Sequence, residues 1–340
     1  MTATPNLNEN GQLSPPGSDG GDPPSLAARL RPLYTKFFRD LDLKPAFKRF
    51  ESERLMEEVL AHASKTGVPC PPNTYSYQSL MVGYTYADNC LPYHDLEVKV
   101  FVAIYTWLAT LCDNAERLDI VADVQMFQQR YIKGDDQPTI LLRAFASQLQ
   151  LAYELYHPLV ANLIINSSFN LLTSTALVAR EGIKEKRYNP SKGGNYFPWY
   201  IRERDGVGEA YAWFTFPKRQ FPNLDVPIEA IEDMTRFIAF ANDVLSFYKE
   251  TLEGETSNYI NTTAAYDETD AITTLYKTSQ DAVNCARRIE SILAGKGEYE
   301  QAWRLHAAGY IQMHIMRARY RLWEVGIGNS PDTKEIVQKD

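Results

Sequence analysis

Three oxygen-bearing side chains, Asn242, Ser246 and Glu250, stand four residues apart in a strongly apolar stretch of the sequence. On a helix, each step of four turns about 400° and rises about 6 Å, so the three share one face over about 12 Å. Mg²⁺ accepts such oxygens while keeping waters and phosphate oxygens in its other positions. A polar stripe facing solvent is the competing interpretation. Because buried polar groups need partners, the apolar context favours a Mg²⁺ site, with Lys249 as a cation beside it.

Two further segments carry cations that suit an anion such as a diphosphate. Arg202 lies in an Arg-Glu-Arg-Asp run, and the pair Arg319-Tyr320 lies in the last helix that the pattern predicts. A guanidinium fork matches phosphate oxygens, and a phenol supplies one more donor. An exposed helix face with ion pairs, or a cationic helix end, would explain the same residues without a ligand.

A fourth candidate, Cys112-Asp113-Asn114-Ala115-Glu116, follows a nearly continuous apolar stretch. Asp113 and Glu116 are candidate ligands for a hard cation, whereas the neutral thiol of Cys112 is a poor one. Asp113 is one position further along a helix, a rotation of about 100°, and could turn inward in place of Cys112.

The elements that position these residues are predicted to be helices throughout. Apolar residues recur at helical spacing from Ser25 onward, and no alternation long enough to suggest a sheet competes. An all-α bundle with its ligand chemistry between facing helices is therefore expected. The main predicted helices are 96–111, a long region 138–180, 228–250, 271–294 and 299–325, with a loop at 181–195.

Composition limits the class of protein. The chain has 340 residues, 44% of them hydrophobic, and a formal net charge of −8. It can bury a large core, and its charge argues against nucleic-acid binding. No signal peptide or membrane span is predicted, and four widely spaced cysteines suit a reducing cytoplasm. We expect one domain at 25–328, a disordered tail at 1–24 and a flexible tail at 329–340.

The stripe resembles a known family pattern. Asn242, Ser246 and Glu250 match the N-D-x-x-S-x-x-x-E motif of class I terpene cyclases, and the stretch NDVLSFYKE is similar to fungal trichodiene synthase and its relatives. The likeness extends over about residues 85–327. It implies a class I terpene synthase-like helical bundle around a deep apolar cavity, Mg²⁺ as cofactor, farnesyl diphosphate as substrate and a homodimer.

The resemblance also implies roles for single residues. Arg202 would contact the diphosphate, Asp205 would link it to Gly206, and the carbonyl of Gly206 would face the substrate cation. Arg319 and Tyr320 would bind the diphosphate on closure. The family's D-D-x-x-D/E motif corresponds to Cys112 to Glu116, so Cys112 replaces the first aspartate. Tyr105, about two helical turns before Cys112, would offer a π face to a carbocation in the cavity.

Three functions follow from these patterns. The first is a sesquiterpene cyclase that ionises farnesyl diphosphate with Mg²⁺ and cyclises the carbocation. The second is a diverged cyclase homologue, changed at Cys112, that acts on a preformed terpene or assists a partner cyclase. The third, a chain-elongating prenyl synthase, fits less well because such enzymes resemble a pattern with two aspartate-rich motifs.

Overall fold

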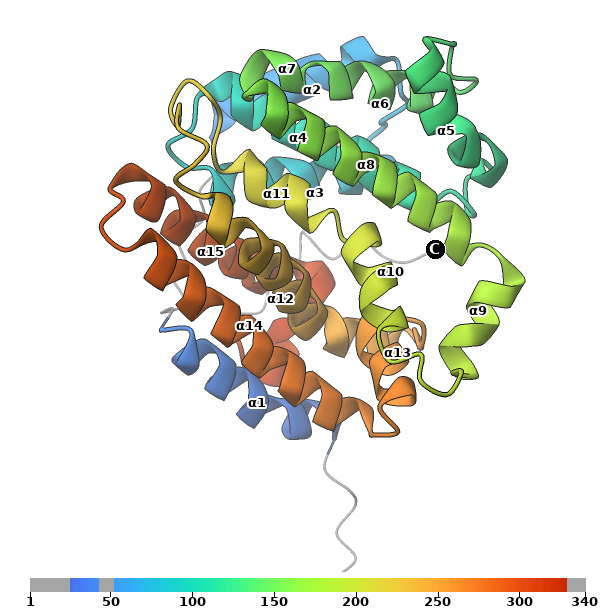
Figure 1. Ribbon diagram of the computed structural model, residues 1–340, viewed down its shortest axis with the longest axis vertical. Helices are drawn as coiled ribbons and strands as arrows, with labels where there is room; N and C mark the ends of the chain where they lie inside the picture. The colour runs from blue at the N-terminus through green and yellow to red at the C-terminus, as the bar shows by residue number, and fades with distance from the viewer. Residues whose placement is uncertain (1–24, 43–51, 329–340) are drawn as a thin grey trace, which may run out of the picture.

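The computed structural model describes residues 25–42 and 52–328, and within these ranges it contains helices and no strand (Figure 1). The expected all-α fold is confirmed for this part of the chain. The expected tails, 1–24 and 329–340, lie outside the described residues. The helices in chain order are α1 Leu26–Asp40, α2 Glu53–Thr66, α3 Tyr75–Cys90, α4 Leu96–Asp113, α5 Val121–Lys133, α6 Ile140–Gln150, α7 Ala152–Leu155, α8 Pro158–Val178, α9 Glu181–Tyr188, α10 Phe197–Asp205, α11 Gly208–Phe214, η1 Ile228–Ala230, α12 Ile231–Leu252, α13 Tyr259–Tyr266, α14 Ala271–Leu293, α15 Glu298–Met316, η2 Ala318–Tyr320 and η3 Leu322–Val325.

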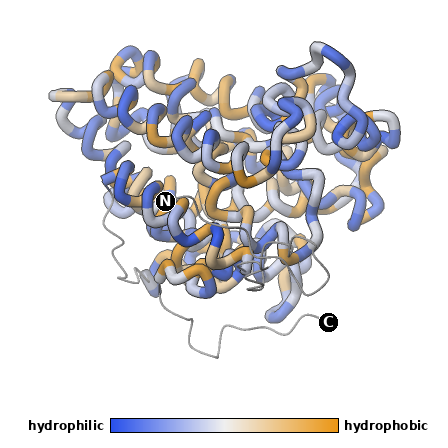
Figure 2. Tube along the Cα trace, turned by 90° about the horizontal axis from the view of Figure 1, so that it is seen from below, coloured by the Kyte–Doolittle hydropathy of each residue, from blue (hydrophilic) through white to orange (hydrophobic). Residues whose placement is uncertain are grey.

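Helix α12 occupies the middle of the bundle. It packs between α11 and α14 and also contacts α15, which in turn packs on α3 (Figure 1). Hydrophobic and hydrophilic positions mix along the individual helices, as amphipathic helices require (Figure 2). The polar residues of α12 are therefore held among packed helices.

Helix α4 is buried on almost all sides. Every residue from Val98 to Ala109 is buried, including Lys99, which forms an ion pair with Asp88 of α3 at 3.2 Å. The two helices approach closely at Gly83, where a Cβ would collide with the carbonyl oxygen of Ala103. This close packing fixes the position at which α4 ends, at Asp113.

Three expected elements are corrected by the structure. The region 138–180 is three helices, because Pro158 starts a new helix with His157 as its N-cap. The segment 181–195 begins with helix α9, whose first turn holds Glu181 and whose last turn holds Lys186 and Arg187, in agreement with the helix dipole.

The last predicted helix, 299–325, is also shorter than expected. Helix α15 ends at Met316, because Arg317 adopts an extended conformation, and two short 3₁₀ turns follow. Arg319 and Tyr320 therefore lie on a turn and not on a helix face. None of the described helices has the length and apolar character needed to cross a membrane.

Candidate active site

The side chains of Asn242, Ser246 and Glu250 on α12 have different surroundings. The amide of Asn242 accepts a hydrogen bond from Arg202 at 3.3 Å and contacts Nε2 of His314 at 3.1 Å. Glu250 accepts a hydrogen bond from Asn258 at 2.9 Å. The hydroxyl of Ser246 is buried and has no hydrogen-bond partner among the residues described.

A buried hydroxyl without a partner is costly, because its desolvation is not compensated. The unpartnered atom lies in the middle of the stripe, between an amide and a carboxylate. A hard cation bound there would gain the Ser246 oxygen as a ligand. The residues present thus fit Mg²⁺ at this stripe.

Arg202 of α10 is tied to α12 by most of its donors. Its Nε donates to both carboxylate oxygens of Asp243 at 2.9 Å, NH1 donates to Asp205 at 3.2 Å, and NH2 donates to the carbonyl oxygen of Ala239 at 3.1 Å. Burial opposes the guanidinium charge, but the carboxylates of Asp243 and Asp205 outweigh it and raise the pKa of Arg202. The guanidinium is thus fully charged and held beside the stripe.

Asp113 and Cys112, neighbours at the end of α4, differ in their exposure. Asp113 is exposed to solvent, yet desolvation by the surrounding protein raises the pKa of its carboxylate, and that of Asp205, to about 6, and the charge of Arg202 counteracts the rise for both. Cys112 is fully buried, and burial raises the pKa of its thiol. The end of α4 therefore has an exposed carboxylate one position after the buried thiol.

Glu116 and Lys249 have partners of their own. Glu116 is exposed and forms an ion pair with Lys184 of α9 at 2.7 Å. Lys249 is largely buried, 3.4 Å from Glu253 and 4.0 Å from Glu250. Lys249 thus lies beside the stripe as predicted, whereas Glu116 points to a surface lysine.

Arg319 and Tyr320 lie on a turn that contacts α12. The guanidinium of Arg319 lies over the ring of Tyr320, 5.3 Å from its centroid, and Tyr320 is buried against His314 with ring centroids 4.3 Å apart. Burial is the main cause that raises the pKa of Tyr75 on α3, whose phenol also interacts electrostatically with both Asp113 and Arg319. The turn thus lies beside His314, which contacts the stripe on α12.

Gly206 and Tyr105 complete the predicted set. Gly206 ends α10 against Arg202, where a Cβ would lie 2.5 Å from NH1 of the guanidinium. Tyr105 is fully buried, its hydroxyl lies 2.7 Å from that of Ser168, and its ring contacts Phe214 edge-on at 4.9 Å. Its exposure to a cavity stays a prediction.

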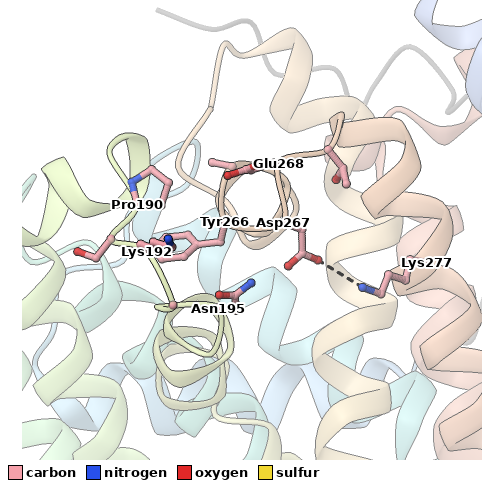
Figure 3. Close-up of a pocket in the computed structure, with 11 residues that line it drawn as sticks. Pro190, Lys192, Asn195, Tyr266, Asp267, Glu268 and Lys277 are labelled. Atoms are coloured by element: carbon pink, nitrogen blue, oxygen red, sulfur yellow. Dashed lines mark hydrogen bonds and ion pairs between the residues drawn. The ribbon is translucent and has the colours of Figure 1, made fainter.

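The pockets that the structure describes lie away from these residues. One, of about 710 Å³, lies between the loop before α10 and the loop after α13 (Figure 3). Asp267 and Lys277 in its lining form an ion pair at 3.3 Å. A second, of about 570 Å³, has Val100, Phe101 and Ile104 in its lining. None of the predicted site residues lines either pocket, so the deep apolar cavity stays a prediction.

The metal would not be held by carboxylates, thiols and imidazoles alone. Among the described residues no group of three or more His, Cys, Asp or Glu could hold a metal ion. Oxygens of Asn242 and Ser246, together with water and phosphate oxygens, would have to complete the coordination, as Mg²⁺ permits.

Two residues at the centre of the site are not among the predicted site residues. Asp243 anchors Arg202, and His314 contacts Asn242. Asp243 lies within the matched motif, so its position was a usable signal. His314 lies about one and a half helical turns before Arg319 and so could face a cavity, but a buried core histidine was the commoner interpretation. Its contact with Asn242 depends on how α15 crosses α12.

Known proteins agree with the class I terpene synthase fold that the sequence predicts. A family described as trichodiene synthase matches residues 74–335. The longiborneol synthase of Gibberella zeae is 71% identical over 339 residues and covers all of both chains. The terpene synthase BipA of Cochliobolus sativus is 34% identical over 296 residues, 86% of this chain and 90% of the relative.

A solved structure agrees at the level of the fold. The linalool/nerolidol synthase of Streptomyces clavuligerus superposes with a TM-score of 0.57 at 11% identity, covering 83% of this chain and 99% of the other. The chain belongs to the trichodiene synthase family. The predicted family and fold class are confirmed, and so is the prediction of a terpene cyclase of the sesquiterpene kind.

Proposed function

We propose that the chain binds farnesyl diphosphate with Mg²⁺, ionises it to a carbocation and diphosphate, and cyclises the carbocation. One water molecule then adds to the final cation and loses a proton, which gives the alcohol longiborneol, the product named for the Gibberella zeae relative. The observation that carries the proposal is the buried, unpartnered hydroxyl of Ser246 between Asn242 and Glu250 on α12. Arg202, beside this stripe, and Asp113, which interacts electrostatically with Arg202, would supply the opposite charges that a diphosphate and its cations need.

The metal ligands would come from two helices. Asn242, Ser246 and Glu250 would hold one Mg²⁺. Asp113 would bind the remaining Mg²⁺ in place of the family's first aspartate, which is Cys112 here. Glu116 would join only after exchanging its contact with Lys184. When bound, Mg²⁺ neutralises the charge that develops on the departing diphosphate.

Four further residues would bind the diphosphate itself. Arg202 would exchange its contacts with Asp205 and Asn242 for phosphate oxygens while Asp243 keeps holding Nε. Lys249 would add a cation, and Arg319 with Tyr320 would donate from the turn after α15. Donors placed where charge develops lower the barrier to ionisation.

The apolar interior would then guide the cation. When Arg202 moves, Asp205 would transmit the change to Gly206, whose carbonyl would face the developing positive charge. Tyr105 would offer a π face, an attraction of about 0.5 to 2 kcal/mol. Exclusion of water would protect the carbocation until the ring system has formed.

The proposal extends to where the enzyme works and how it assembles. We place the enzyme in the cytoplasm, with residues 25–328 as one catalytic domain that forms a homodimer. The alternative of a homologue that acts on a preformed terpene or assists a partner cyclase is not favoured, since a relative 71% identical over the whole chain is named as a synthase.

The test is an incubation of the purified full chain with farnesyl diphosphate and Mg²⁺, followed by gas chromatography and mass spectrometry against authentic longiborneol. The parent and a Glu232→Gln variant, changed at an exposed ion pair in the first turn of α12, should form product. Glu250→Gln should not. No terpene from the parent, with product restored in Cys112→Asp, would contradict the proposal.

A further inference from the structure

His314 is a fully buried histidine in the last turn of α15, next to the Asn242–Glu250 stripe. Its Nδ1 lies 2.8 Å from the carbonyl oxygen of Tyr310, one helical turn earlier. Because a carbonyl oxygen can only accept a hydrogen bond, Nδ1 carries a proton and Nε2 is free to present a lone pair. The backbone of α15 thus selects the nitrogen that faces α12.

This lone pair decides which way the amide of Asn242 points. Nε2 of His314 lies 3.1 Å from Nδ2 of Asn242, a group that can only donate. On the other side of the amide, Oδ1 accepts from the guanidinium of Arg202 at 3.3 Å. A flipped amide would place its oxygen against the lone pair of His314 and its N–H groups against those of Arg202.

The orientation matters because only one end of the amide can bind a hard cation. Mg²⁺ takes oxygen ligands, and an amide NH₂ has no lone pair to offer. We propose that His314 is a positioning residue that keeps Oδ1 of Asn242 on the side of the cation site, an inference that rests on the function proposed above. Loss of a group that orients a metal ligand typically costs about 10- to 100-fold in metal affinity.

The same imidazole also packs against Tyr320. The two rings are tilted by 37° with their centroids 4.3 Å apart. A substitution that keeps a ring at position 314 preserves this packing, but it removes both the acceptor for Asn242 and the Nδ1–H that donates to Tyr310. His314→Phe is therefore compared with His314→Gln, which restores an acceptor for Asn242.

The experiment measures thermal unfolding of the full chain at a fixed concentration of inorganic pyrophosphate and increasing Mg²⁺. The Mg²⁺ concentration that gives half of the stabilisation should rise about 10- to 100-fold in His314→Phe. His314→Gln should restore most of the affinity, because its side-chain oxygen can accept from Asn242. If His314→Phe does not fold, His314→Asn serves, because its short amide can bond to Tyr310 but does not reach Asn242.

Two matched controls separate positioning from general damage. His306 is a second buried histidine on α15, bonded to Tyr86 and Thr215 and not to the stripe, so His306→Phe should leave the Mg²⁺ midpoint unchanged. In an Asn242→Asp background both side-chain oxygens can bind the cation, so His314→Phe should no longer raise the midpoint.

Three outcomes would overturn the inference. An equal rise in His306→Phe and His314→Phe, or an undiminished rise in the Asn242→Asp background, would show a structural role and leave the proposed function standing. No stabilisation of the parent by Mg²⁺ with pyrophosphate would instead remove the proposed function, and this inference with it.

Discussion

Helix α12 and the end of α4 carry two candidate metal-binding motifs. The motif on α12 retains every residue of the family pattern, whereas the motif on α4 has lost its first aspartate. On α12 the three oxygens stand at helical spacing, and the middle one, Ser246, has no partner among the residues described. At the end of α4 the position of the first aspartate in the family pattern holds the buried thiol of Cys112, and the next residue, Asp113, is exposed and interacts electrostatically with Arg202. In the function proposed above, Asp113 would take over the role of the residue replaced by Cys112, so that the ligand would move by one position along α4.

The largest expected effect is at the end of α4. Asp113→Asn should lower turnover of farnesyl diphosphate by about 10²- to 10³-fold, the scale on which loss of one group that stabilises developing charge is felt. Cys112→Ser should stay close to the parent, because the thiol is not the ligand. The turnover of both variants is measured by the steady-state release of pyrophosphate. An equal loss of turnover in the two would mean that Cys112 contributes to the site as much as Asp113 does.

The next effect concerns the stripe on α12. Ser246→Ala should weaken Mg²⁺ binding with pyrophosphate by about 10- to 100-fold. Without metal the same variant should be more stable than the parent by about 1 kcal/mol, since it removes a buried hydroxyl that has no partner. Urea unfolding with and without Mg²⁺ and pyrophosphate measures both the change in metal affinity and the change in metal-free stability. A loss of stability in the metal-free protein would show that Ser246 has a structural partner.

A smaller effect is expected at Glu116. Its ion pair with Lys184 is exposed, and such pairs contribute only about 0 to 1 kcal/mol. Glu116→Gln should therefore lower turnover by about tenfold at most, well below the loss in Asp113→Asn. A loss as large as that of Asp113→Asn would place Glu116 among the principal metal ligands.

The smallest effect on turnover near neutral pH is expected in the core, away from both motifs, where a substitution changes the pH dependence of stability instead. Burial lowers the pKa of His306 to about 3, whereas a histidine in the unfolded chain titrates near 6.5. Between pH 6.5 and pH 3, His306 is protonated in the unfolded chain but not in the folded protein. The contribution of His306 to stability is therefore complete above pH 6.5 and is lost as the pH falls toward 3. Between pH 5.5 and 4 the loss is about 1.4 kcal/mol per pH unit.

Urea unfolding of the parent and of His306→Gln across this range isolates the contribution. The free energy of unfolding should fall more steeply with decreasing pH in the parent than in the variant. The difference in slope should be about 1.4 kcal/mol per pH unit, which corresponds to the uptake of one proton. Parallel pH dependences would mean that His306 is protonated in the folded protein. Because both proteins keep Asp113, Asp205 and His314, the titration of those groups cancels in the comparison.

The sequence predicts those parts of the molecule that local periodicity determines. The 3.6-residue repeat places Asn242, Ser246 and Glu250 on one face, and the apolar run before Cys112 predicts a buried helix, as found. The segment 181–195 contains glycines and a proline that predict a loop, yet charges at both ends stabilise the short helix α9.

Contacts between distant segments could not be predicted in this way. The end of α15 at Met316 and the position of His314 beside Asn242 depend on packing between helices about 70 residues apart. The electrostatic interaction of Asp113 with Arg202 likewise joins segments that are distant in the sequence. The site was thus predictable where one helix carries it, and was not where two helices meet.

The most direct test of the central claim is anomalous diffraction from crystals of the full chain grown with Mn²⁺ and pyrophosphate. Mn²⁺ takes the same oxygen ligands as Mg²⁺ and can be located by its own scattering. The account predicts Mn²⁺ bound by Asn242, Ser246 and Glu250, and further Mn²⁺ bound by the carboxylate of Asp113. Mn²⁺ absent from the α12 stripe, or bound by the sulfur of Cys112 with Asp113 turned away, would contradict it.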